Sequence, residues 1–153
     1  MDNPFHTTGL RHGTDDPRGL RERIEAQLTE RIDEAVDMAA LHLLVELRKR
    51  HGRPAPESDS RDDRDEFNAL AADLLAYLGE AFAAELDADQ RCELDQVSAG
   101  GADARARGLR GQVFLSRQLP DYWQRFEAHR GAHAEARLNS PDRPSSFFKR
   151  LFG

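Results

Sequence analysis

The sequence has little of what marks a secreted, membrane-spanning or disulfide-bonded protein. Cys92 is the one cysteine among 153 residues, so no internal disulfide can form and a reducing compartment is the simplest expectation. The longest apolar stretch, residues 38–47, contains His42 and Glu46 and is far short of the ~20 residues that span a bilayer. Residues 1–6 are neither basic nor followed by an apolar run. We therefore expect a cytoplasmic protein whose membrane contact, if any, is peripheral, on the inner face of the cell membrane.

Residue patterns that carry chemistry are also scarce. His129 and His133 are four residues apart on a predicted helix, a spacing that can present two imidazoles to one metal ion. No third ligand shares their face, so we expect two solvated histidines. The carboxylates of Asp33, Glu34 and Asp37 lack the Glu-x-x-His partners of a di-iron site and are expected to form a solvated face. The sequence thus predicts no enzyme, no cofactor and no metal site.

Helical periodicity, by contrast, is strong. From Leu20 onward, apolar residues recur every three or four positions for about 30 residues. Asp16 is a suitable N-cap, Pro17 suits the first helical position, and Gly52 can close the helix. The pattern predicts a helix over residues 17–51, about 50 Å long. A helix of this length needs a partner along most of its course, either a second helix or another subunit.

The rest of the chain predicts shorter helices. An apolar stripe from Phe67 to Leu86 indicates a second long helix, which can fold back antiparallel on the first as an αα-hairpin. Asp87 and Gln90 form a capping-box pattern that starts a helix over residues 88–98. Two more helices are expected over 102–119, which Gly108 and Gly111 weaken, and over 121–138.

We therefore expect an all-α fold, in which three shorter helices pack on a long antiparallel αα-hairpin. The chain divides by composition into four parts: a disordered N-terminal arm (1–15), a helical domain (16–138), a linker (139–146) and an amphipathic tail (147–153). Apolar surface on so long a hairpin favours a homo-oligomer formed through the first helix.

Charge is unevenly distributed along the chain. Residues 1–102 hold 12 Arg and Lys against 23 Asp and Glu, whereas residues 103–153 hold 10 against 5. The basic part is expected to face something anionic, for which nucleic acid and lipid headgroups are the candidates. Tyr122, Trp123 and Phe126 lie among arginines, as in some single-strand binders. At helical spacing such aromatics are more often core contacts with an arginine rim, so nucleic acid is an unlikely partner.

The tail has the pattern of an interfacial helix. Phe147, Phe148, Leu151 and Phe152 fall on one helical face, and the cations Lys149 and Arg150 lie beside it; these are our candidate docking residues for a membrane or a protein partner. Four large apolar side chains contribute ~1.5–3 kcal/mol each when buried, and two cations ~1 kcal/mol each at an acidic surface. Ordering the segment costs ~1–2 kcal/mol per residue. One tail should therefore bind weakly and reversibly.

The last residues, Phe-Phe-Lys-Arg-Leu-Phe-Gly, resemble the C-terminal membrane-targeting sequence of the MinD-type division-site proteins of bacteria. The resemblance covers residues 146–153 only, and the body lacks the phosphate-binding Gly-Lys-Ser/Thr loop of those ATPases. It implies reversible attachment to the cytoplasmic face of a bacterial inner membrane. The leading hypothesis is a non-enzymatic adaptor or regulatory protein attached in this way. The alternatives are a soluble interaction protein whose tail docks into a protein partner, and a nucleic-acid-associated protein that uses the basic C-terminal third.

Overall fold

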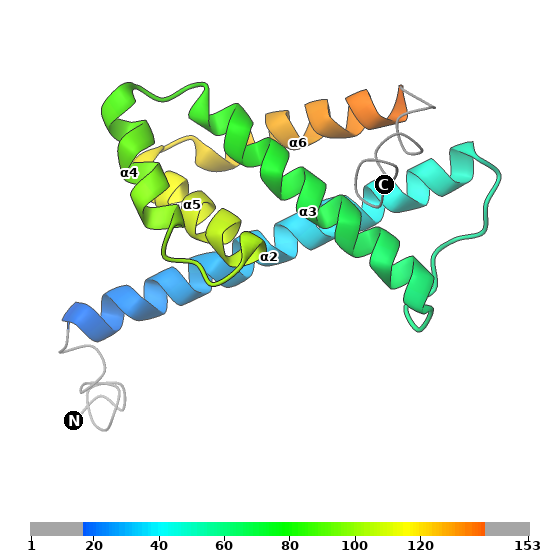
Figure 1. The fold of residues 1–153 in the computed structure, drawn as a ribbon, viewed down its shortest axis with the longest axis horizontal. Helices are drawn as coiled ribbons and strands as arrows, with labels where there is room; N and C mark the ends of the chain where they lie inside the picture. The colour runs from blue at the N-terminus through cyan, green and yellow to red at the C-terminus, as the bar shows by residue number, and fades with distance from the viewer. Residues whose placement is uncertain (1–16, 140–153) are drawn as a thin grey trace, which may run out of the picture.

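The architecture is known from a computed structural model, which describes residues 17–139. Over this range the chain is helical without any strand, as predicted (Figure 1). The helices are α2 (Pro17–Arg50), α3 (Arg61–Ala83), α4 (Ala88–Ser98), α5 (Ala104–Gln118) and α6 (Tyr122–Leu138). The predicted arm (1–15), most of the predicted linker and the whole tail (147–153) lie outside the described residues.

Local signals fix where several helices begin and end. The Asp87 side chain accepts a hydrogen bond from the Gln90 N–H and the Gln90 side chain accepts one from the Asp87 N–H, so the predicted capping box is confirmed. Asp103 caps α5 in the same manner, by accepting from the Ala106 N–H at 2.8 Å. Gly52, with a φ of 65°, follows the end of α2 in the left-handed conformation that favours glycine.

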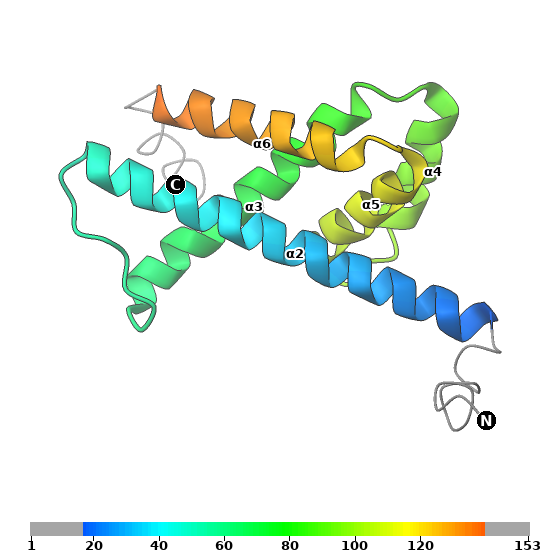
Figure 2. The same cartoon turned by 180° about the vertical axis from the view of Figure 1, so that it is seen from behind.

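The core lies between α2 and α3, with α5 and α6 closing it. After the 51–60 connection α3 folds back and crosses α2 obliquely, a relationship seen from both sides in Figures 1 and 2. Leu44 of α2, Leu78 and Phe82 of α3, Leu115 of α5 and Phe126 of α6 are among the side chains with almost no solvent exposure. Because α4 packs mainly on α5, this pair forms a smaller unit against one side of the hairpin.

One end of α2 extends beyond the other helices. Its first turns, which we call the overhang (residues 17–27), project past the bundle in both views (Figures 1 and 2). Leu20 and Ile24 on the overhang are 42% and 44% exposed, and the buried face of α2 begins only at Ile32. Among residues 17–139, the packing partners that this helix was predicted to need are present from about Leu28 onward.

Two glycines make the close packing of α5 possible. A Cβ atom at Gly101 would lie 2.4 Å from the backbone nitrogen of Arg107, so the turn into α5 has no room for a side chain. A Cβ atom at Gly108 would lie 2.7 Å from Cγ of the buried Leu75, where α5 meets α3. Gly108 lowers the intrinsic helical stability of α5, but it lets α5 approach α3 closely.

Candidate functional site

The two candidate histidines face α3 rather than solvent. His133 is 4% exposed, and its Nε2 lies 2.8 Å from Oδ2 of Asp73. His129 is half-buried, with Nε2 3.3 Å from Oε2 of Glu85. The expectation of solvated histidines is wrong, because α6 packs this side onto α3. The two imidazoles contact different carboxylates, and no cluster of three metal-ligating side chains occurs among the residues of α2–α6 and their connections.

The carboxylate run on α2 also has a structural contact. Arg105 of α5 donates to Asp33, and its Nη2 lies 2.9 Å from Oδ1 of Asp37. These two carboxylates are partly exposed and link α2 to α5, so only part of the run is the solvated face that the sequence predicts.

Further arginines of the basic C-terminal part contact acidic residues of the N-terminal part. Arg117 pairs with Glu25 at 2.7 Å, and Arg125 pairs with Glu85 at 2.9 Å. Arg137 lies 2.9 Å from Asp73, the carboxylate that also contacts His133. The charge asymmetry along the sequence is therefore used within the fold, where arginines of α5 and α6 contact carboxylates of α2, of α3 and of the connection after α3.

The aromatic cluster belongs to the core, as its helical spacing predicts. Tyr122 and Phe126 have almost no exposure, and the Tyr122 hydroxyl donates to Oε1 of Gln112 at 2.6 Å. Burial raises the pKa of the Tyr122 phenol far above its usual value. The Trp123 ring lies under the Arg31 guanidinium, 4.4 Å from its centroid. Tyr122 and Phe126 accordingly have no free face for a nucleic-acid base.

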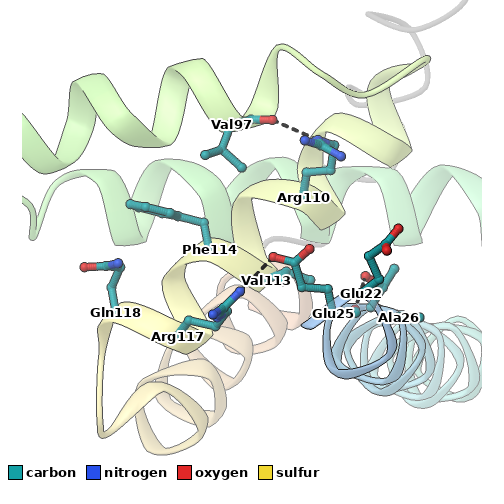
Figure 3. Close-up of a pocket in the computed structure, with 10 residues that line it drawn as sticks. Glu22, Glu25, Ala26, Val97, Arg110, Val113, Phe114, Arg117 and Gln118 are labelled. Atoms are coloured by element: carbon teal, nitrogen blue, oxygen red, sulfur yellow. Dashed lines mark hydrogen bonds and ion pairs between the residues drawn. The ribbon is translucent and has the colours of Figure 1, made fainter. Parts of the chain in front are cut away.

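An open groove lies where the overhang leaves the bundle (Figure 3). It has a volume of about 550 Å³, one wall from α2 and the other from α4 and α5. Its lining combines apolar side chains with both signs of charge: Glu22, Glu25, Ala26, Thr29, Val97, Arg110, Val113, Phe114, Arg117 and Gln118. We call this feature the α2–α5 groove.

Two contacts hold the arginines of the groove against its walls. The Arg110 Nε donates to the Val97 carbonyl oxygen at 2.9 Å, and the Arg117 Nη1 lies 2.7 Å from Glu25 Oε2 (Figure 3). Between them Phe114 is only partly buried. The groove therefore combines the partly buried ring of Phe114 with charged groups that contacts within the chain hold in place.

A second exposed apolar surface runs along α2. Leu20, Ile24, Met38 and Leu41 are large hydrophobic side chains that are at least 40% exposed, and all of them lie on this helix. The predicted docking residues of the tail lie outside the described residues: Phe147, Phe148, Lys149, Arg150, Leu151 and Phe152.

The described helices include none that is both long and apolar enough to cross a bilayer. No protein-family model, curated protein or solved structure matches the chain. The functional case is therefore carried by the groove, the exposed face of α2 and the sequence of the tail. The groove could not be predicted from sequence periodicity. Its walls come from residues about 70–95 positions apart, which meet only through the packing of α4 and α5 on α2.

Proposed function

We propose that this protein is a non-enzymatic bacterial adaptor, attached peripherally to the cytoplasmic face of the membrane by its C-terminal tail. The observation that carries the proposal is the tail pattern, with Phe147, Phe148, Leu151 and Phe152 on one helical face and Lys149 and Arg150 beside it. Aromatic and aliphatic side chains enter the acyl boundary of a bilayer, while the two cations contact anionic headgroups.

The position of the end of α6 supports this role. The chain leaves α6 beside the C-terminal end of α2, where the Arg50 Nη1 donates to the Leu138 carbonyl oxygen at 3.3 Å. The α2–α5 groove lies toward the other end of α2, at Glu22–Thr29. The end of α6 and the groove therefore lie toward opposite ends of α2.

The nucleic-acid alternative has less support from the described residues. Arg105, Arg117, Arg125 and Arg137 all contact carboxylates of the same chain. A phosphate backbone would have to displace these pairs before it could bind the same guanidinium groups.

Vesicle co-sedimentation tests the membrane proposal. We expect the full chain to sediment with vesicles that contain anionic lipid, and to sediment much less with neutral vesicles. A chain that ends at Pro144 should stay in the supernatant in both cases. As a matched pair, Phe148→Ser should remove an inserting side chain and weaken binding at every lipid composition, whereas Lys149→Gln should weaken binding to anionic vesicles alone. Equal sedimentation of the full and shortened chains would show that the tail is not the anchor, and would leave docking to a protein partner as its role.

A further inference from the structure

A second hollow in the bundle lies where α4 and α5 meet the second half of α3, an arrangement visible from both sides in Figures 1 and 2. Its volume is about 300 Å³, at the small end of ligand-binding pockets. Six of its lining residues have small side chains or none: Ala76, Gly79, Ala83, Ser98, Gly108 and Gly111. We call this feature the α3–α5 pocket.

The wall that α3 contributes to this pocket is open. A Cβ atom at Gly79 would meet nothing within 4 Å, so the space beside this residue is free for another side chain. Leu94 of α4 and Leu115 of α5 also line the pocket, and both are buried. A large apolar side chain that enters between α3 and α5 would therefore contact carbon on both sides.

A buried amide indicates what else the pocket can bind. Gln112 lines it and is 1% exposed, and its Oε1 accepts a hydrogen bond from the Tyr122 hydroxyl at 2.6 Å. Within residues 17–139 its Nε2 has no hydrogen-bond acceptor. Buried donors in folded proteins are almost always paired, so this amide is available to an acceptor that enters the pocket. A peptide carbonyl oxygen is such an acceptor.

The charge of the pocket favours a cationic ligand. The charged residues in its lining are Glu80 of α3 and Asp95 of α4, and both are exposed. Neither carboxylate forms an ion pair with another of the described residues. Two carboxylates beside an apolar hollow fit a peptide in which large apolar side chains are followed by cations. The C-terminal tail has this order, since residues 147–148 are phenylalanines and residues 149–150 are Lys and Arg.

The tail also begins within reach of the pocket. α6 runs antiparallel to α3, because His129 contacts Phe82 and Arg137 contacts Asp73. The pocket residues of α3 follow Asp73 by 3 to 10 positions, which is about 5–15 Å along the helix, and they lie on a neighbouring side of it. The eight residues from 140 to 147 extend over at most about 26–29 Å, enough to pass around α3 to the pocket.

The α2–α5 groove is too far away for the same contact. The chain leaves α6 beside Arg50, and the groove residues Glu22–Thr29 precede Arg50 by 21 to 28 positions. This separation is about 32–42 Å along α2. It exceeds the length of extended chain that leads to Phe147, so the length of the linker favours the α3–α5 pocket.

From these observations we infer that the C-terminal tail docks in the α3–α5 pocket of its own chain. Its phenylalanines lie among the small side chains, its two cations lie beside Glu80 and Asp95, and a tail carbonyl oxygen accepts from Gln112. The docked side chains are the ones that would enter a bilayer, so docking and membrane attachment exclude each other. This regulatory consequence rests on the proposed function, whereas the docking itself does not.

Amide NMR signals of the ¹⁵N-labelled full chain test the docking in the absence of lipid. The double variant Phe147→Ser with Phe148→Ser should change the chemical shifts of Gly79, Gly108 and Gly111, because their surroundings lose the docked rings. The signal of Gly131 on α6 should stay where it is, since this residue lies outside the pocket.

Two helical glycines provide a matched pair of backgrounds, because an added Cβ atom meets nothing within 4 Å at Gly79 or at Gly131. Gly79→Leu fills the pocket, so the serine substitutions should no longer shift Gly108 and Gly111 in that background. In Gly131→Leu they should shift both signals as before. Circular dichroism of each variant verifies that the helices are retained.

Three results would overturn the docking. The first is a serine variant whose pocket glycines keep their original shifts. The second is a change in shift that depends on protein concentration, which would indicate docking between two chains. The third is a change at Ala26 and Val113 in place of the pocket glycines, which would assign the tail to the α2–α5 groove.

Vesicle sedimentation then tests the regulation separately. Gly79→Leu should bind anionic vesicles more tightly than the original chain, by about 10-fold where the tail is docked about nine-tenths of the time. Gly131→Leu should bind as the original chain does. Equal affinity of Gly79→Leu and the original chain would overturn the regulatory part. If no variant binds vesicles but the pocket glycines still respond to the serine substitutions, the membrane proposal and its regulation fail and the docking stands.

Discussion

At the scale of single residues, Arg48 shows how a buried charge can organise the connection between two helices. Its side chain is almost fully buried and contacts Asp63 at 2.7 Å, Glu66, and the Pro54 carbonyl oxygen at 3.3 Å. Asp63 also accepts a hydrogen bond from the Glu57 N–H at 2.8 Å. One guanidinium therefore joins the end of α2, the connection that follows it and the first turns of α3.

These contacts predict a specific dependence of stability on pH. The Arg48 side chain, with a further contribution from the Glu57 N–H, holds the pKa of Asp63 below its usual value near 4. A carboxyl whose folded-state pKa is lowered stabilises the fold above the usual value, and that stabilisation is lost as the pH falls through the folded-state pKa. We expect Asp63→Asn to keep the shape of the side chain but to reduce the loss of unfolding free energy between pH 7 and pH 3.

Urea unfolding of the two proteins at a series of pH values measures this difference. Asp89→Asn provides the control, since this residue is an exposed carboxylate in the first turn of α4 and makes no ion pair with Arg48. If the original chain and Asp63→Asn lose the same free energy on acidification, the Arg48–Asp63 contact does not contribute to acid stability.

At the scale of helices, most of what the sequence predicts is local and the structure bears it out. The capping box at Asp87 and the periodicity of the later helices place each element within a few residues of its observed bounds. Cap hydrogen bonds and apolar spacing act over four to seven residues, so they can be read from the chain directly. The role of Gly108 was not accessible in this way, because the neighbour that requires a glycine, Leu75, lies 33 positions earlier in the sequence.

Alanine should therefore stabilise the protein at one helical glycine, Gly131, and should not stabilise it at another, Gly108. Alanine is preferred to glycine inside a helix by about 1 kcal/mol. At Gly131 of α6 a Cβ atom would meet nothing within 4 Å, so Gly131→Ala should raise the unfolding free energy by up to ~1 kcal/mol. At Gly108 the added carbon would overlap the buried Leu75, and overpacking costs ~1–3 kcal/mol. Gly108→Ala should therefore leave stability unchanged or reduce it by up to ~2 kcal/mol.

Urea unfolding measures both effects: the midpoint urea concentrations of the variants are compared, provided that the dependence of the unfolding free energy on urea has the same slope in each. The double variant Gly108→Ala with Leu75→Ala supplies the control, because removing the leucine side chain makes room for the new methyl group. The added effect of Gly108→Ala should be more favourable in that background. A stabilising effect of equal size at both glycines in the original chain would contradict the close approach of α5 to α3.

At the scale of the whole molecule, the packing of helices decides which apolar residues face solvent. The apolar pattern of α2 continues without a break from Leu20 to Leu47, so it gives no sign of where the cover of neighbouring helices ends. The oblique crossing of α3 leaves the overhang outside the bundle (Figure 1), and α4 and α5 then form the groove beside it. The pairs that join α5 and α6 to α2 and α3 likewise connect residues 60 to 92 positions apart. Such contacts depend on tertiary structure. The only sign of them in the sequence is the uneven distribution of acidic and basic residues along the chain.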